Sequence, residues 1–443
     1  MKTLPCFARF AHFSSFAAAL LLAAPPLFAG DTVSPGWSLA VQPNPAFGAA
    51  VCTLPGGDLV TFDGISIDRW SPAGAFVANL GTLPGFVFAS FAVPTPDGLA
   101  IVVGDSGNAS SQTGSLHLAK ADGSGTSFLM NLAFTYDAVF LASGELIVSA
   151  ATGGFGNGND LVRVSLAPPQ ATAIGHVPGA SGPVAIDSGG HLYYATASDA
   201  FPAPAGSSDV LRWSAAQVQA GGLTSASAVL VGAAFDGAAS MAVDPVTERP
   251  YLAEVNFSLA VNRIVRVEAT QAISPVVLDS TDVLSGLQFV NLAGGAASFD
   301  AYQPETGMNL RCTVTDFAAR SDVLTVRPAR PVISASGPGL SGPGPITVTV
   351  TGGVPNGIAR LTACPQSAIT APEKTYMLPS FLHHTGFDLS KTRRAPGSVS
   401  ADAQGKASYA LFNNGNLLGL NGYQFFVGTA AGTFVGSSTS VAF

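Results

Sequence analysis

Acidic side chains recur in this sequence where a short apolar run ends or is about to begin. Six of them stand at such places: Asp63, Asp105, Asp137, Asp236, Glu254 and Asp300. Carboxylate oxygens are the ligands that Ca²⁺ and other hard cations prefer, so these residues are the candidate ligand or metal positions. An aspartate at a strand end also fixes turns by accepting hydrogen bonds from nearby amides, and this structural interpretation competes with the first.

Other polar motifs point less clearly to chemistry. The stretch "GDSGNAS" (104–110) contains Gly-Asp-Ser but not the Gly-x-Ser-x-Gly elbow of a serine hydrolase. The loop "GGFGNGND" (153–160) lacks the spaced acidic ligands of a calcium loop. His383 and His384 are adjacent, and neighbours on a strand face opposite ways. The sequence therefore assigns no catalytic residue.

The elements that must position these residues repeat along the chain. From about residue 46 to 327, alternating apolar runs of five to seven residues are bounded by Gly, Pro, Asp and Ser, which predicts an all-β fold. A strand, turn and strand unit recurs six times: "AVCTLPGGDLVTF" (50–62), "FAVPTPDGLAIVV" (91–103), "AVFLASGELIVS" (138–149), "VAIDSGGHLYYA" (184–195), "MAVDPVTERPYLA" (241–253) and "LQFVNLAGGAASF" (287–299). Successive turns are 41 to 59 residues apart. Such a period predicts a six-bladed β-propeller.

A second marker follows each turn and places an arginine beside an apolar residue. It occurs as "IDRW" (67–70), "LVRV" (161–164), "VLRW" (210–213), "IVRV" (264–267) and "NLRC" (309–312), with "SLHL" (115–118) in the second unit. On alternating strands the last residue of each marker points inward between blades and the preceding arginine points the other way. We expect these arginines to be structural.

The fifth unit resembles a known repeat. "LAEVNFSLAVNRIVRV" resembles the NHL-repeat pattern of a strand, a loop, then Asn-Arg-Ile and a strand, and "GPVAIDSGGHLYYA" resembles the start of such a repeat. This resemblance implies a six-bladed ring whose ligands bind at the loop face of the channel. Six-bladed relatives that act as lactonases hold a metal with Glu, Asn and Asp. The first unit begins "FGAAVCTL", without an acid at that opening.

The two ends of the chain suggest further parts. Residues 1–29 carry Lys2, Arg9 and an apolar stretch ending in small residues, which predicts an export signal cut after Ala29. The propeller is expected over 36–328, with "GWSLAVQ" (36–42) adding an outer strand to "SDVLTVRP" (321–328). A Pro/Gly/Ser linker (329–345) precedes a β-sandwich-like domain (346–443), which is similar to C-terminal modules of large secreted bacterial proteins.

Composition narrows the possible functions. The net charge of −8 argues against a nucleic-acid partner, which would require a basic stripe. No transmembrane run follows the signal, so we expect a protein secreted or retained in the periplasm or envelope. Three cysteines remain after cleavage, which allows one bridge at most among Cys52, Cys312 and Cys364. We expect a non-catalytic scaffold for an unidentified protein, small-molecule or glycan ligand, with Ca²⁺ as the one cofactor considered. The alternative is a metal-dependent hydrolase or lactonase working at the channel mouth.

Overall fold

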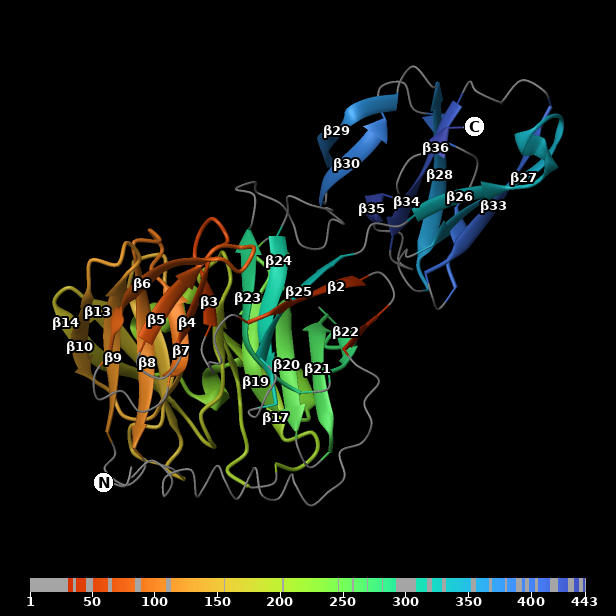
Figure 1. Cartoon of the computed structure of the whole chain (residues 1–443). Helices are drawn as coiled ribbons and strands as arrows, with labels where there is room; N and C mark the ends of the chain where they lie inside the picture. The colour runs from red at the N-terminus through yellow and green to blue at the C-terminus, as the bar shows by residue number, and fades with distance from the viewer. Residues whose placement is uncertain are drawn as a thin grey trace.

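The computed structural model consists almost entirely of antiparallel strands (Figure 1). It describes residues 31–34, 37–44, 51–62, 66–83, 89–108, 113–154, 156–200, 203–245, 247–256, 259–268, 270–280, 282–291, 308–316, 321–328, 332–351, 356–365, 369–378, 381–387, 393–394, 398–402, 405–414, 421–428, 434–437 and 441–442. The predicted signal peptide lies outside these residues.

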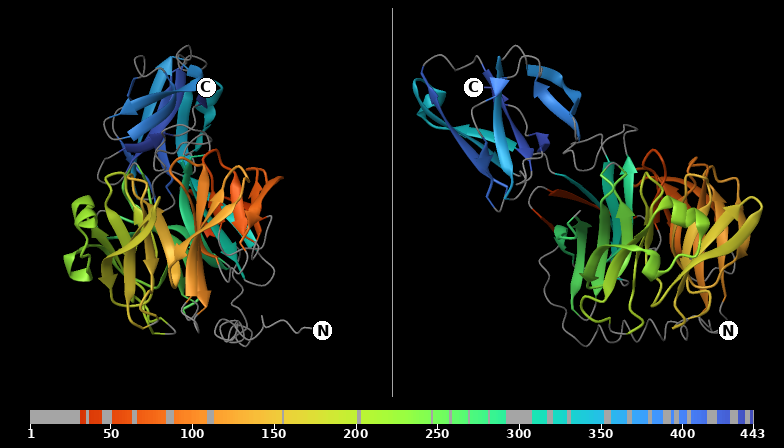
Figure 2. Two further views of the ribbon diagram at one scale, coloured as in Figure 1. Left: turned by 90° about the vertical axis from the view of Figure 1, so that its left-hand side faces the viewer. Right: turned by 180° about the vertical axis from the view of Figure 1, so that it is seen from behind.

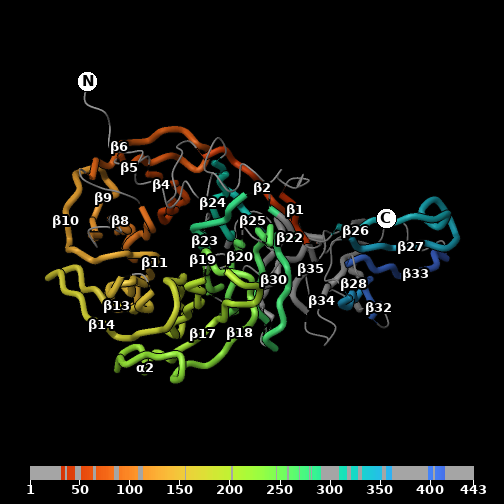
Figure 3. The backbone as a smooth tube through the Cα atoms, turned by 90° about the horizontal axis from the view of Figure 1, so that it is seen from below, coloured from red at the N-terminus to blue at the C-terminus, as the bar shows by residue number. Residues whose placement is uncertain are grey.

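Six sheets, here called blades, follow one another in chain order around a ring (Figure 3). The first three, from inner to outer strand, contain β3 (Val51–Thr53), β4 (Leu59–Phe62), β5 (Ser66–Trp70) and β6 (Phe76–Thr82), then β7 (Ala89–Pro94), β8 (Ala100–Asn108), β9 (Thr113–Lys120) and β10 (Thr126–Asn131), then β11 (Thr135–Phe140), β12 (Leu146–Ala150), β13 (Asn159–Leu166) and β14 (Pro169–Val177).

The other three blades contain β15 (Val184–Ile186), β16 (Leu192–Ala195), β17 (Ser208–Trp213) and β18 (Val229–Phe235), then β19 (Ala238–Val243), β20 (Pro250–Asn256), β21 (Val261–Val267) and β22 (Ile273–Asp279), then β23 (Val283–Asn291), β24 (Met308–Thr315) and β25 (Ser321–Pro328). This arrangement confirms the prediction of an all-β, six-bladed propeller. A short helix, α2 (Ala215–Ala220), interrupts the fourth blade, where Ser214 and Gln217 form a capping box.

The N-terminal strands complete the last two blades. β2 (Trp37–Pro43) pairs with β25 in one unbroken register, from Trp37 opposite Pro328 to Pro43 opposite Asp322, and this confirms the predicted closure. β1 (Thr32–Val33) adds a fifth strand to β22, which the sequence did not predict. Pairing the two ends of the propeller closes the ring and covers strand edges that would otherwise be open.

The core lies between neighbouring blades. Four of the six marker residues predicted to point inward are at most 2% exposed: Val164, Trp213, Val267 and Cys312. Two of the marker arginines, Arg69 and Arg163, contact the following blade. Arg69 pairs with Asp58 and donates 3.1 Å to the carbonyl of Ala121 in the second blade. Arg163 donates to the carbonyl of Val218, on α2 of the fourth blade.

The sixth repeat differs from its prediction. β23 pairs directly with β24, with Gln288 opposite Arg311, so "NLRC" belongs to the second strand of its blade and not to the third. The expected equivalence of Arg311 with the other marker arginines is therefore wrong. In this blade the second strand begins only at Met308, whereas the repeat spacing predicted it to end near residue 299. The run that contains "NLRC" was therefore assigned to the third strand although it forms the second. Arg311 still links blades, since Nη1 donates 3.2 Å to the carbonyl of Gly57.

The C-terminal strands form two further sheets and a hairpin that stand apart from the ring (Figure 2). One sheet contains β26 (Val332–Ser336), β27 (Gly344–Thr351) and β33 (Ala407–Asn413); the other contains β28 (Ile358–Pro365), β31 (Arg393–Arg394), β32 (Val399–Ser400), β34 (Asn421–Gly428), β35 (Phe434–Ser437) and β36 (Val441–Ala442); and the hairpin joins β29 (Ile369–Leu378) to β30 (Phe381–Phe387). Ile346, Val348 and Leu361 pack between the sheets. β26 uses residues from the predicted linker as an edge strand.

Candidate functional site

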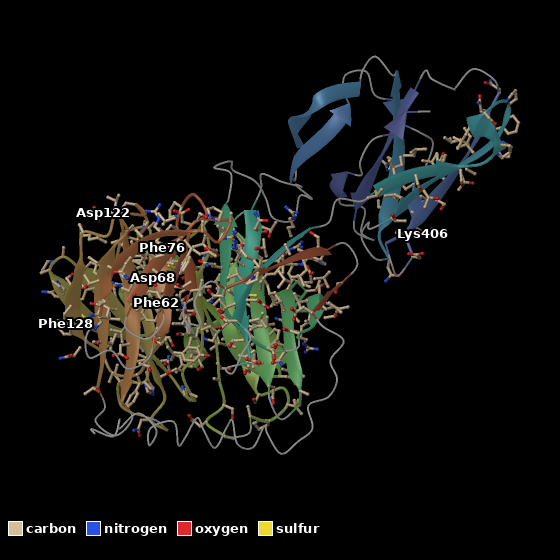
Figure 4. All side chains as sticks on the ribbon, in the orientation of Figure 1. Phe62, Asp68, Phe76, Asp122, Phe128 and Lys406 are labelled. Carbon is tan, nitrogen blue, oxygen red and sulfur yellow. The ribbon has the colours of Figure 1, made fainter. Side chains whose placement is uncertain are left out.

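Among the described residues, the predicted carboxylates form no group of three that could hold a metal ion. Asp63 and Asp300 lie outside the described residues; Asp63 follows Phe62, the last residue of β4 (Figure 4). Asp105 and Glu254 occupy matching positions in their blades, because they pair with Ala89 and Ala238, the first residues of β7 and β19. The second and fifth blades of a six-bladed ring are diametrically opposite, so Asp105 and Glu254 come from opposite sides of the ring.

Asp236 and Glu254 do come together, with a third residue between them. Glu254 is fully buried, and its Oε1 accepts from the amide of Asp236 at 2.9 Å. Arg263 donates to both of its carboxylate oxygens, through Nε at 2.5 Å and Nη2 at 3.2 Å. The same guanidinium lies 3.5 Å from Asp236 Oδ2. The hydrogen bond to Glu254 is the main cause that raises the pKa of Arg263.

The strand register explains why Arg263 takes this position. β20 and β21 pair with Glu254 directly opposite Arg263, so the two side chains leave the sheet on one face. The Asn-Arg-Ile motif contains this arginine, but the motif does not indicate that its partner is Glu254. The register between two strands is decided by how they pair. Glu254 and Arg263 therefore form an ion pair within the fifth blade.

The cluster also holds a loop of the neighbouring blade. Gly206, in the connection between β16 and β17, donates its amide to Asp236 Oδ1 at 3.0 Å. Asn256 Nδ2 donates to the carbonyl of Ala203 at 3.2 Å and to that of Asp236. Its Oδ1 accepts from the amide of Leu259 at 3.3 Å. Asp236 and Asn256 therefore position the connection between β16 and β17, which the fourth blade contributes to this end of the ring.

Asp137 serves a seam between blades. Its Oδ2 accepts from the amide of Val184 on β15 at 3.0 Å, and its Oδ1 accepts from the amide of Ala138 at 2.9 Å. Burial raises its pKa to about 7, against the opposing effect of the two amides. The side chain nevertheless keeps some accessible surface, as expected for a residue on an innermost strand.

Other inner strands are joined by comparable polar pairs. Ser90 Oγ lies 2.9 Å from Thr135 Oγ1, and Ser240 Oγ accepts from the amide of Leu287 at 2.8 Å. Gln288 Nε2 donates to Thr53 Oγ1 at 3.0 Å, across the seam that closes the ring. Asp137 thus belongs to a series of contacts between neighbouring blades, and this favours the structural interpretation of its carboxylate.

Tyr136 is a channel residue that the sequence analysis missed. It lies on β11 of the third blade, and its hydroxyl donates to the carbonyl of Ala239 on β19 of the fifth blade at 3.2 Å. The fourth blade stands between these two in the ring, so the side chain reaches across the channel and narrows it at this depth. An alternating strand with one tyrosine carries no signal that would distinguish a channel-spanning residue from a packed one.

Side-chain contacts within the third blade hold the Gly-rich loop after β12. His176 Nδ1 lies 2.8 Å from Asp160 Oδ1, and Thr152 Oγ1 donates to the other oxygen of Asp160. Asp160 therefore stands between the hydroxyl and the imidazole. In a catalytic triad the imidazole contacts the nucleophile and the carboxylate lies behind it, so this order does not activate Thr152.

Two further expectations concern metals and thiols. Among the described residues, no three His, Cys, Asp or Glu side chains are grouped so as to hold a metal ion. Cys52 and Cys312 are both free and buried, which contradicts the possibility that Cys52 is bridged. The side chain of Cys364 lies outside the described set.

No helix within the described part of the chain is long and apolar enough to cross a membrane.

Comparison with known proteins gives low similarities. No protein-family model matches the chain, and no curated protein sequence does. Solved structures that resemble it include a gluconolactonase from Xanthomonas campestris, with a TM-score of 0.47, 11% identity and coverage of 69% of this chain and 96% of that one. A calcium-binding regucalcin from Agrobacterium tumefaciens has a TM-score of 0.43, 12% identity and coverage of 67% and 97%. TolB from Acinetobacter baumannii has a TM-score of 0.39, 12% identity and coverage of 72% and 70%.

Proposed function

We propose that this chain is an exported, non-catalytic binding scaffold of the bacterial envelope or the extracellular space. In this proposal its ligand, a protein, small molecule or glycan, binds at the end of the ring that carries the loops after the second strands. The loop positioned by Asp236 and Asn256 would form part of that surface. The predicted export signal and the C-terminal domain belong to the same proposal.

The observation that carries the proposal is that the described carboxylates accept hydrogen bonds from groups of the protein. Glu254 accepts from a guanidinium and a main-chain amide, Asp137 from two amides, and Asp105 Oδ1 from the amide of Gly107 at 3.0 Å. A metal ligand must direct its lone pairs at the cation, and a hydrolytic metal site also needs an open coordination position. At least one oxygen of each of these carboxylates already accepts a hydrogen bond from the protein.

Metal analysis of the purified chain distinguishes the scaffold from a metal-dependent hydrolase or lactonase. We expect substoichiometric Ca²⁺, Mn²⁺ and Zn²⁺, and the same melting temperature with and without EDTA. The matched control is Asp122→Ala, a change in an exposed turn at the outside of the ring (Figure 4). One equivalent of metal that is lost in Asp63→Ala, together with hydrolysis of a sugar lactone, would refute the proposal.

A further inference from the structure

One sheet of the C-terminal domain has an uncharged outer face that is rich in hydroxyl groups. The sheet consists of β26, β27 and β33 (Figure 1), and none of these strands contains a charged residue or a histidine. On β27, Ile346, Val348 and Val350 are buried against the second sheet, and the threonines that alternate with them point outward. β26 and β33 alternate in the same way, so the three strands share one outer face.

Strand pairing arranges the outward side chains of this face in rows that cross the sheet. In one row Thr349 lies opposite both Ser334 and Ser408, and the hydroxyl oxygens of Thr349 and Ser408 are 2.9 Å apart. The next row consists of Ser336, Thr347 and Ala410. A hydroxyl group has one donor and two acceptor lone pairs, so the paired hydroxyls of Thr349 and Ser408 keep further capacity for a ligand.

An exposed phenylalanine stands at one end of these rows. Phe412 is 65% exposed, and it lies directly opposite Pro345, which is also exposed. Residues two apart on a strand share a face, so Phe412 follows Ser408 and Ala410 along β33 on the same side of the sheet. The face therefore combines an apolar platform with rows of hydroxyl groups.

We propose that this face binds an uncharged polysaccharide. A pyranose ring has an apolar side of C–H groups, which packs on an aromatic ring, and hydroxyl groups, which exchange hydrogen bonds with serine and threonine. A charged polymer would instead be recognised by side chains of opposite charge, and these three strands have none. A sugar chain laid along β33 places one ring on Phe412 and the next rings beside Ser408 and Thr349.

A second copy of the chain fits this face less well. Val332 is 54% exposed and lies opposite Thr351, in the row farthest from Phe412. The large apolar side chains are thus separated by the two hydroxyl rows, whereas interfaces between subunits concentrate apolar residues at their centre. The polysaccharide site is separate from the surface proposed at the loop end of the ring, and it does not depend on what that surface binds.

Native electrophoresis of residues 30–443 in gels that contain barley β-glucan tests the proposal. We expect the β-glucan to retard the wild type, and Phe412→Ala to weaken the association about tenfold, as truncation of a central aromatic contact does. Phe76→Ala is the matched control, because Phe76 is 57% exposed but lies on the first blade (Figure 4), and it should leave the retardation unchanged. Alginate, which is anionic, should retard none of these proteins.

A second variant separates hydrogen bonding from folding. Thr347→Val combined with Thr349→Val removes two hydroxyl groups and keeps β-branched side chains on the strand. It should bind the β-glucan severalfold more weakly at an unchanged melting temperature.

Three outcomes would overturn the proposal. The first is a wild type that β-glucan does not retard, and the second is equal retardation of the wild type and both variants. The third is a wild-type dimer in sedimentation that Phe412→Ala dissociates, because this would identify the face as a contact between copies. None of them would change the metal content that tests the proposed function of the propeller.

Discussion

At the scale of single residues, the acidic side chains of this chain differ in what surrounds them. Glu254 is buried beside Arg263, whereas Asp137 lies at a seam between blades, where it accepts hydrogen bonds from two amides. An enclosed carboxylate with a guanidinium keeps its charge because the pair compensates for lost hydration. A carboxylate enclosed without a cation resists ionisation, which is why the pKa of Asp137 is raised.

Glu254→Ala should destabilise the propeller because it leaves the amide of Asp236 without its acceptor and Arg263 with Asp236 as its remaining carboxylate neighbour. We expect a loss of about 2 kcal/mol, below the usual cost of breaking one partner from a fully buried pair, because Arg263 is 35% exposed. The double variant Glu254→Ala with Arg263→Ala should lose less than the sum of the single changes. Urea unfolding measures each value, with Asp122→Ala as the unaffected control. Equal stability of wild type and Glu254→Ala would contradict the assignment.

Asp137 should make stability depend on pH. The folded carboxyl keeps its proton up to about pH 7, whereas the unfolded one releases it near the ordinary pKa of 3.8. Stability is therefore lost as pH rises from about 4 to 7, by roughly 2 kcal/mol after allowing for the accessible surface of the side chain. Asp137→Asn cannot ionise and should reduce the fall between pH 5 and pH 8. Parallel curves for variant and wild type would count against this prediction.

At the scale of elements, loops from one blade depend on side chains of the next. The connection between β16 and β17 is held by Asp236, in the connection from the fourth to the fifth blade, and by Asn256 of the fifth blade. The connection between β12 and β13 is held from within its own blade, where Asn157 Nδ2 donates to the carbonyl of Gly153 at 2.7 Å. The loop end of the ring is thus ordered in two different ways.

Asn256→Ala should loosen the loop around Gly206 without unfolding the blades. Losing the bonds to Ala203 and Asp236 should cost about 1 to 2 kcal/mol of local stability. Hydrogen exchange at the amide of Gly206 should accelerate roughly tenfold, which corresponds to 1.4 kcal/mol. Asn157→Ala is the matched control and should leave exchange at Gly206 unchanged. Similar acceleration in both variants would indicate a general loss of stability.

At the scale of the whole molecule, closure joins strands from opposite ends of the propeller. β2 pairs along its whole length with β25, and β1 with β22, so the sixth blade gains its fourth strand and the fifth blade an additional one when the two ends of the propeller meet. A ring closed in this way couples its blades, because detaching β1 and β2 exposes the outer strands of two blades together. The buried cysteines report on this coupling.

Cys52 and Cys312 should resist alkylation until the ring opens. Burial raises the pKa of Cys52 to about 12 and also raises that of Cys312, so few thiolates form near neutral pH. Mass spectrometry with iodoacetamide should show both sites reacting at one common rate in moderate urea. Trp37→Ala should increase both rates. Rapid labelling of either site in native buffer would contradict the described burial.

Much of the architecture followed from local patterns. Alternation of apolar and polar residues, turns ending in glycine and the repeat period predicted the six blades, and "GWSLAVQ" predicted the closing strand. Each of these depends on neighbours in sequence or on a strand's need for a partner. The sixth repeat was the exception, because the longer connection between β23 and β24 breaks the period on which the assignment of Arg311 relied.

Which candidate residues come together depended on contacts between segments that are far apart in the sequence. Nothing in "EVNFSLAVNRIVRV" indicates that Glu254 pairs with Arg263, that Gly206 of another blade binds Asp236, or that Asp105 belongs to the blade opposite that of Glu254. Strand propensity and hydrophobic burial act over a few residues and can be read along the chain. Hydrogen bonds between side chains and loops depend on register, blade order and ring closure, and these exist only once the propeller has folded.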